Sequence, residues 1–242
     1  MKKSPIRGMI HTHYMRRFFY DKTTVALQKL GYAVFFLAYK IFVSLEIKGK
    51  ENIKHLTGPI ILAANHTNEL DVTSIPLVLP FFSPLYPIFF VMNPIEKFKT
   101  FGWRSYIYGT TFLNMLGGYS IYSGYKDYAT SLEDHISILK NGGTLCIFPE
   151  GKRTRDGNLN PARGGLGFLI HTTGATVVPV VIDTFFNMSV IDFFTRRRKV
   201  VITILPPMTK QDIISENIEN PSTEDYRGWS QKVMDKIKFA LN

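Results

Sequence analysis

The stretch Ile60–Asp71, IILAANHTNELD, joins a short apolar run to a polar cluster and decides the fold. The apolar run follows Gly58-Pro59 and is typical of a fully buried strand. Polar residues begin at Asn65, and a helical pattern resumes near Val72. The point where a strand passes into a helix is where open α/β sheets carry their chemistry. We therefore interpret this stretch as the centre of an α/β fold.

His66 and Asp71 within this stretch are candidates for a general base and its partner. Histidine has the reference pKa closest to neutrality, so it can take a proton from a hydroxyl at physiological pH. Asp71 could hold one ring nitrogen and leave the other free as the base. The two residues would lie about 140° apart on a regular helix, so they meet only if the chain turns between them. The alternative is a capping aspartate near an unrelated surface histidine.

A second polar cluster supports the first. The run Thr144–Phe148 resembles another buried strand, and Pro149–Arg155 (PEGKRTR) follows it directly. Because the carboxyl ends of parallel strands meet at one edge of a sheet, we expect the two clusters to lie close together.

With both clusters, residues 49–207 resemble the glycerolipid acyltransferases, the 1-acyl-glycerol-3-phosphate (PlsC-like) family. Asn65-His66-x4-Asp71 resembles the first block of that family, and Phe148–Thr154 (FPEGKRT) its third. Val177–Val180 (VVPV) resembles the fourth block, and residues 117–123 occupy the place of the second. The resemblance implies that His66 is the base and Asp71 its partner. It also implies that Glu150 and Arg153 bind the acceptor, and that Gly151, Thr154, Gly118 and Pro179 are further substrate-binding residues.

The second block departs from the family pattern at one position. An arginine that helps bind the acceptor phosphate usually follows Gly-Gly-x-x-Ile-x, and here that position is Ser123. Serine offers one neutral hydrogen bond where arginine offers a charged fork. Three readings stay open: Lys126 supplies the charge, Arg153 with Arg155 suffices, or the acceptor is not lysophosphatidic acid.

The resemblance implies transfer of a fatty acyl group from acyl-CoA or acyl-carrier protein to a hydroxyl of a lysophospholipid in phospholipid biosynthesis. The first candidate for the acceptor is 1-acyl-sn-glycerol-3-phosphate. The thioester is then a co-substrate, and no cofactor or metal is expected. The alternatives are another lyso- or amino-lipid acceptor, a thioester or lipid hydrolase, and a non-catalytic lipid-binding membrane protein. The intact His66-x4-Asp71 and Glu150-x2-Arg153 argue against the last of these.

Composition indicates a single sizeable core and an anionic partner. The chain has 242 residues, 45% of them hydrophobic, and a formal charge of +10 from 29 Lys and Arg against 19 Asp and Glu. Such a surplus suits nucleic acid, an anionic membrane or an acidic carrier. Because no nucleic-acid-binding signature is present, we favour the membrane. One cysteine, Cys146 in an apolar run, excludes a disulfide framework and indicates a reducing compartment.

The N-terminal region is basic and then apolar. Residues 1–20 interleave five bases with aromatic and apolar residues, which predicts either a frayed terminus or an arm on anionic headgroups. Leu30–Leu45 is apolar nearly all round but is shorter than the ~20 residues of a spanning helix. We interpret it as a helix that dips into one leaflet, or spans if Val25–Leu27 join it. We predict a membrane-associated protein on the cytoplasmic face, with a membrane segment at 1–48 and a catalytic domain at 49–242.

The remaining patterns alternate between strands and helices, which predicts an α/β fold. We expect a mixed sheet flanked by helices, glycerol-3-phosphate acyltransferase-like, with the N-terminal membrane-associated helical segment. The aromatic run 101–116 is either ordinary core or the lining of an acyl-chain groove. Phe185–Phe194 leads into Arg196–Lys199 (RRRK), which is either a solvated basic turn or a second membrane contact. We further predict strands at 86–92, 176–183 and 199–205, and helices at 72–79, 126–140, from 163, and at 226–241.

Overall fold

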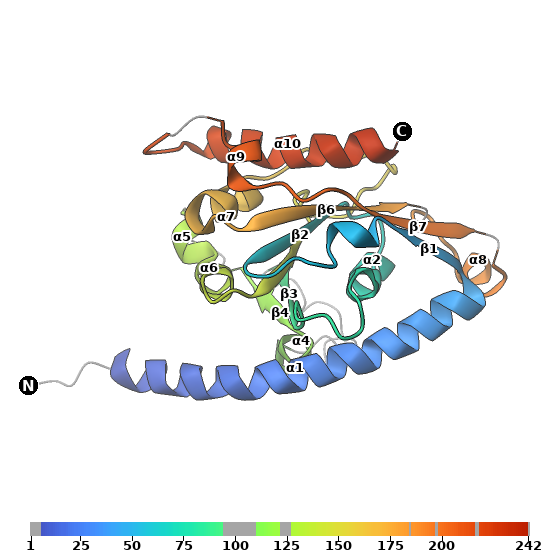
Figure 1. The fold of residues 1–242 in the computed structure, drawn as a ribbon, viewed down its shortest axis with the longest axis horizontal. Coiled ribbons are helices and arrows are strands. Elements are labelled where there is room, and N and C mark those ends of the chain that lie inside the picture. The colour runs from blue at the N-terminus through green and yellow to red at the C-terminus, as the bar shows by residue number, and fades with distance from the viewer. Residues whose placement is uncertain are drawn as a thin grey trace, which may run out of the picture.

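A mixed seven-stranded sheet runs through the centre of the molecule (Figure 1). The computed structural model describes residues 6–93, 110–121, 127–183, 185–196, 198–215 and 218–241; for 6–21 and 110–112 it describes the backbone alone. The strand order is β1-β7-β6-β2-β5-β3-β4. The strands are β1 Ser44–Lys48, β2 Ile60–Ala64, β3 Ile88–Met92, β4 Gly118–Ser120, β5 Thr144–Ile147, β6 Thr176–Asp183 and β7 Lys199–Ile204.

Five of these strands are parallel and end at one edge of the sheet. β2 lies between β5 and β6, with Ile60 opposite both Thr144 and Thr176. β3 and β4 continue the parallel set beyond β5. β7 pairs with β6 in the antiparallel sense and with β1 in the parallel sense, which makes the sheet mixed as predicted.

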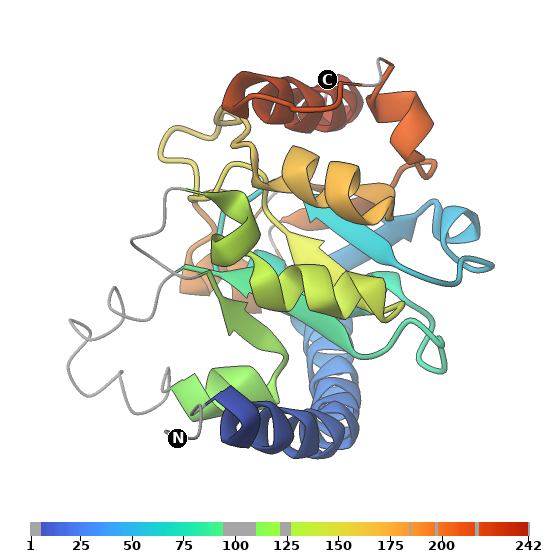
Figure 2. The same cartoon turned by 90° about the vertical axis from the view of Figure 1, so that its left-hand side faces the viewer.

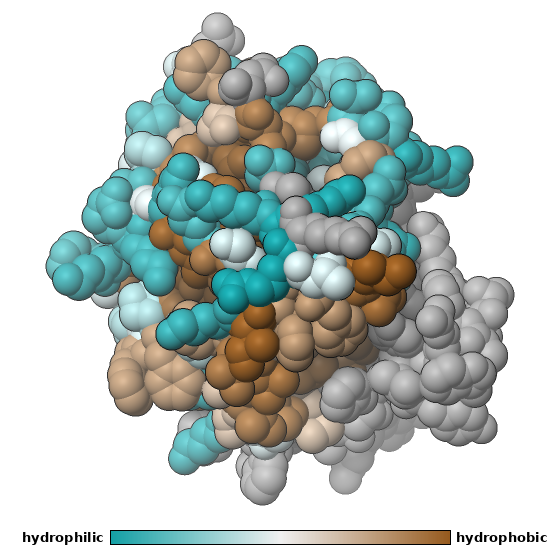
Figure 3. Space-filling view, turned by 90° about the vertical axis from the view of Figure 1, so that its right-hand side faces the viewer, coloured by the Kyte–Doolittle hydropathy of each residue, from teal (hydrophilic) through white to brown (hydrophobic). Residues whose placement is uncertain are grey.

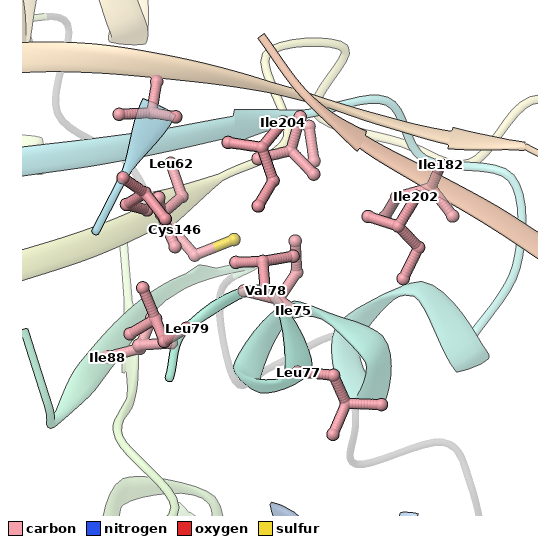
Figure 4. Close-up of a cluster of buried hydrophobic side chains, with 14 of the residues drawn as sticks. Leu62, Ile75, Leu77, Val78, Leu79, Ile88, Cys146, Ile182, Ile202 and Ile204 are labelled. Carbon is pink, nitrogen blue, oxygen red and sulfur yellow. The ribbon is translucent and has the colours of Figure 1, made fainter. Parts of the chain in front are cut away.

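Helices cover both faces of the sheet, and the residues of β2 alternate between the two layers (Figures 1 and 2). Ile61 and Ala63 pack under α6 (Glu133–Lys140), α7 (Gly165–Thr173) and α10 (Thr223–Leu241). Leu62 and Ala64 pack on the other face, where α1 (Ile6–Phe42), α2 (Leu70–Ser74) and the 3-10 helix η2 (Ile75–Val78) lie (Figure 4). A strand covered on both faces is continuously apolar, which explains the run that opens the central stretch. The other helical elements are η1 Lys50–Asn52, α4 Thr110–Met115, α5 Tyr128–Ser131, α8 Val190–Phe194 and α9 Lys210–Ile213.

The boundary between the N-terminal helix and the sheet differs from the expectation. We expected the apolar helix to run to Leu45 and the sheet to begin after Gly49. Instead, α1 ends at Phe42, and Ser44–Lys48 is already a strand, paired with β7. Leu45-Glu46-Ile47 alternates apolar and polar residues, as an edge strand does, and Glu46 pairs with Lys199 of β7 at 2.5 Å. Gly49 then makes the turn at a φ of 72°.

One face of α1 is buried against the rest of the molecule. Thr24, Gln28 and Tyr39 are buried, and Gln28 donates to the carbonyls of Ile88 (2.6 Å) and Leu116 (2.9 Å). The backbone N–H of Ile88 donates to the Gln28 amide oxygen at 2.9 Å. The opposite face exposes apolar side chains, namely Leu30, Val34, Phe36, Leu37 and Ile41. Lys22–Phe42 is long and apolar enough to cross a membrane by length and composition alone.

Most of the other predicted elements are present, with one break. The helix predicted over 126–140 divides into α5 and α6 at Leu132, which is buried and has a non-helical φ of −116° and ψ of 20°. The first piece is capped by Asp127, which accepts a hydrogen bond from the backbone of Thr130 at 2.7 Å. The predicted groove at 101–116 lies mostly outside the described residues, as do Ser123 and Lys126.

Candidate active site

The two polar clusters meet at the carboxyl edge of the sheet, as their positions after adjacent strands predict. β2 and β5 are parallel neighbours, so the loops that follow them start side by side. The backbone N–H of His66 donates to Glu150 Oε1 at 2.8 Å. The backbone N–H of Thr154 donates to the His66 carbonyl at 3.0 Å. Through the N–H and the carbonyl of His66, these two hydrogen bonds join the loop after β2 to the loop after β5.

The His66 ring is held by Asp71. Nδ1 lies 2.9 Å from Asp71 Oδ2, and because a carboxylate oxygen only accepts, Nδ1 carries the proton and Nε2 carries the lone pair. The same oxygen also accepts from the backbone N–H groups of Thr67 (2.5 Å) and Asn68 (2.7 Å). The chain between His66 and Asp71 therefore turns around the Asp71 carboxylate. Asp71 is fully buried in the first turn of α2, whereas the His66 side chain is 18% exposed. The arrangement leaves a basic ring nitrogen beside a buried carboxylate.

Phe148 fixes the plane of the His66 ring. The two rings stack with their centroids 4.2 Å apart and their planes 20° apart. Phe148 follows β5 directly, so the same strand end that carries the second polar cluster also supports the histidine. In the sequence, Phe148 is the last apolar residue before the cluster and the first residue of the third block, which does not indicate that its ring stacks on the histidine.

Glu150 holds the backbone around the site. The carboxylate is buried, and besides His66 it accepts from the Asn160 backbone (2.7 Å) and the Asn160 side chain (2.9 Å) through Oε2. Asn160 belongs to the turn-rich loop and was not among the predicted site residues. The acceptor contact implied for Glu150 stays a prediction. In this structure both of its oxygens are engaged with the protein.

Gly151 and Thr154 shape the loop after β5. Gly151 has a φ of 66°, and a Cβ there would lie 2.7 Å from Cδ of Arg163, so no other residue fits without a shift. The Thr154 hydroxyl bonds Asp156 Oδ1 at 2.9 Å and accepts from the Gly157 backbone at 3.1 Å. Both residues thus have local structural contacts, and their predicted role in binding stays a prediction.

Arg153 supplies a positive charge at the rim of the site. Its Nη1 donates to Glu69 Oε1 at 2.9 Å, and the two side chains are 51% and 69% exposed. Glu69 lies between His66 and Asp71 in the chain and was not predicted as a site residue. An exposed pair of this kind contributes about 0–1 kcal/mol, so an anionic ligand can displace the glutamate from the arginine.

Two predicted residues lie within the sheet, away from these loops. Pro179 is buried in β6 opposite Ala63. Gly118 is in β4, three strands from β2, where a Cβ would lie 2.5 Å from Sδ of Met92. The structure does not bring either of them to His66, and their predicted roles in binding stay predictions.

Neither a cysteine nucleophile nor a metal cluster accompanies the histidine in the part of the chain that the structure describes. Cys146 is buried in β5, and burial raises the pKa of its thiol, so it is neither accessible nor ionised at neutral pH. Within the described ranges, no group of three or more His, Cys, Asp or Glu side chains is placed to hold a metal ion.

Comparison with known proteins identifies the family of the chain. Two chloroplastic 1-acyl-sn-glycerol-3-phosphate acyltransferases are similar to 58% of the chain: one from Brassica napus at 25% identity and one from Arabidopsis thaliana at 26%. The matches cover 38% and 36% of those relatives, so the chain spans well under half of their length. The crystal structure of the 1-acyl-sn-glycerophosphate acyltransferase PlsC from Thermotoga maritima has the same fold, with a TM-score of 0.58 at 20% identity over 90% of this chain and 78% of that one. The family model described as Acyltransferase matches residues 44–183, more than half of the sequence and including both polar clusters. The chain therefore belongs to the acyltransferase family.

Proposed function

We propose that this protein is an O-acyltransferase that moves a fatty acyl group from an acyl-CoA or acyl-carrier-protein thioester to a hydroxyl of a lysophospholipid. The observation that carries the proposal is the His66–Asp71 pair, with Nδ1 bonded to a buried carboxylate at 2.9 Å. This arrangement makes Nε2 a base, and the stacked Phe148 ring holds it in place.

In the proposed reaction, His66 Nε2 takes the proton of the acceptor hydroxyl while the oxygen attacks the thioester carbonyl. A carbon–oxygen bond forms, the carbon–sulfur bond breaks, and the proton passes from the imidazolium to the leaving thiolate. Asp71 stabilises the imidazolium, as a carboxylate does in this type of pair. General-base help contributes about 10²–10⁴-fold in rate, or roughly 3–5 kcal/mol. The direct attack needs no acyl-enzyme and no cofactor.

For the acceptor we propose 1-acyl-sn-glycerol-3-phosphate, modestly ahead of other lysolipids. The names of the chloroplastic relatives support this acceptor. Arg153 supports it too, because its side chain is exposed at the rim and its partner Glu69 is still more open to solvent. A phosphate offers arginine a stronger, bidentate partner than a single exposed carboxylate oxygen.

We also propose that α1 lies on the cytoplasmic leaflet of an anionic membrane rather than crossing it. The buried Gln28 ties α1 to β3, and the buried Tyr39 ties it to α2, so one face of the helix is fixed against the folded domain. The exposed row of Leu30, Val34, Leu37 and Ile41 is left to enter the lipid. Membrane attachment next to the site fits an acceptor that is itself a lipid.

A panel assay tests the proposed reaction. The protein is incubated with lysolipids of several headgroups and with acyl-CoA or acyl-carrier protein, and the products are separated by mass. We expect a new ester in the lysolipid, with lysophosphatidic acid giving the highest rate. Release of free fatty acid without ester would identify a hydrolase, and lysolipid binding without turnover would identify a lipid-binding protein; either result would overturn the proposal.

A second assay tests the acceptor. Rates on lysophosphatidic acid and on a phosphate-free acceptor are compared for the wild type, Arg153→Ala and the matched variant Glu69→Gln. We expect Arg153→Ala to raise KM for the phosphate acceptor about tenfold or more and to spare the other, because a charged hydrogen-bonded contact contributes roughly 1.5–3 kcal/mol. Glu69→Gln should leave KM for the phosphate acceptor unchanged or lower it. An equal loss on both acceptors for Arg153→Ala would show that Arg153 does not bind the phosphate.

A further inference from the structure

The short helix α8 exposes an unusual density of apolar side chains for its length. Of its five residues, Val190 is 73% exposed, Ile191 63% and Phe194 56%. The helix is nonetheless well defined by its N-cap, since Ser189 and Asp192 form a reciprocal capping box. Phe193 packs inward, and Phe194 contacts Phe42 but stays largely exposed, as do Val190 and Ile191.

α8 is attached to the end of α1. Phe193 packs edge-on against Tyr39 at 5.9 Å between ring centroids, and Phe194 does so against Phe42 at 4.9 Å. The exposed residues of α8 therefore lie beside the C-terminal end of α1, where Ile41 is exposed too. Figure 3 views this end of the molecule and shows its largest apolar area in the lower part of the face, beneath a band of hydrophilic side chains.

Basic residues follow α8 directly. Arg198 donates to the Phe186 carbonyl at 2.5 Å, and Lys199 pairs with Glu46 at 2.5 Å. Arg196 is exposed and forms no ion pair with any described residue. Apolar and aromatic anchors beside basic residues are the usual combination of groups that bind the boundary between anionic headgroups and acyl chains.

We propose that α8, through Val190, Ile191 and Phe194, is a second membrane contact that enters the same lipid leaflet as α1, with Arg196 on the anionic headgroups. Three side chains offer too small an area for a stable protein partner, which needs roughly 800 Å² per side. A lipid surface has no such threshold, because each apolar side chain that enters it adds its own transfer free energy. This inference rests on the proposed membrane attachment of α1 and adds a contact to it.

A fluorescence experiment tests the contact directly. The only native cysteine, Cys146, is buried, so a thiol-reactive, environment-sensitive dye labels a cysteine introduced at Ile191→Cys. Phe239→Cys is the matched control, since Phe239 is 84% exposed on α10, which lies on the opposite face of the sheet (Figure 1). On vesicles that contain anionic phospholipid, we expect the emission at position 191 to rise and shift to the blue, and that at 239 to stay unchanged. No change at position 191 would overturn the inference, as would a change produced by raising the protein concentration alone, which would identify a second copy as the occupant.

A partition measurement separates this inference from the rest of the account. Vesicle sedimentation compares the wild type, the triple variant Val190→Ser, Ile191→Ser, Phe194→Ser, and the matched variant Phe239→Ser. We expect the triple variant to bind at least about tenfold more weakly and the control to bind as the wild type does. If the triple variant binds normally while serines at Leu30, Val34, Leu37 and Ile41 release the protein, α8 is not a contact but the α1 proposal stands. Acyl transfer to a water-soluble short-chain acceptor should be unaffected in the triple variant and in the Phe239→Ser control.

Discussion

At the scale of single residues, two buried carboxylates organise the site. Asp71 and Glu150 are both inaccessible to solvent, and a buried charge is costly unless hydrogen bonds satisfy it. Each of them accepts three hydrogen bonds from N–H groups, and each set includes one from His66. Asp71 holds the ring of the histidine and Glu150 holds its backbone, so the base is fixed at both ends.

Glu150→Gln tests whether Glu150 is a support or a ligand. An amide would direct its NH2 group at one set of N–H donors, which leaves buried donors without an acceptor and costs about 1–3 kcal/mol. We expect a lower urea midpoint together with a reduced acyl transfer rate. Loss of activity at unchanged stability would instead indicate a direct contact with the acceptor.

The sequence predicted those site residues that follow each other closely in the chain. His66 and Asp71 are five positions apart, and the strand-to-helix corner that brings them together is visible as the end of an apolar run. Phe148 and Glu69 were missed because their contacts with His66 and Arg153 cross between loops that are separated by the whole of β3, β4 and α6. Asn160 was missed because its contact with Glu150 depends on how the turn-rich loop between them folds back. A one-dimensional pattern reports local spacing and carries no signal for such pairs.

At the scale of elements, α1 is joined to the helix that carries Asp71. The hydroxyl groups of Tyr39 and Thr73 lie 2.6 Å apart, and Thr73 belongs to α2. The Tyr39 ring also packs against Phe185, whose carbonyl accepts from the Asn68 side chain at 3.1 Å. The helix that we place on the membrane thus contacts the catalytic loop through two routes.

Tyr39→Phe removes one of these routes without changing the packing of the ring. We expect a stability loss of about 0.5–1.5 kcal/mol and a severalfold fall in kcat, because α2 and Asp71 are held less firmly. Vesicle binding should not change, since Tyr39 faces the protein. Wild-type kcat at an undiminished stability would show that the hydroxyl pair has no part in positioning Asp71.

The elements were predicted well where burial on both faces produces continuous apolar runs, as in β2, β5 and β6. The errors fell where packing rather than pattern decides. β1 is a short amphipathic edge strand that looks like the end of the preceding helix, and the break between α5 and α6 follows from the burial of Leu132. The helical pattern around Leu132 gave no sign of this break.

At the scale of the whole molecule, the active site lies beside the proposed membrane surface. The carboxyl edge of β2 and β5 carries His66, and α1 touches α2 at the same end of the sheet through Tyr39. A lysolipid could then present its headgroup to Arg153 and its hydroxyl to His66 while its acyl chain stays near the leaflet. This arrangement explains why a basic, apolar N-terminal helix is built into the fold.

The most direct test of the account is the rate of acyl transfer from a thioester to lysophosphatidic acid by His66→Ala. The matched control is His55→Ala, an exposed histidine in the turn before β2, and circular dichroism with urea unfolding checks that both variants fold. We predict that His66→Ala loses about 10²–10⁴-fold in kcat/KM while His55→Ala keeps the wild-type rate. A folded His66→Ala variant that stays within about tenfold of the wild type would contradict the role of His66 as the general base.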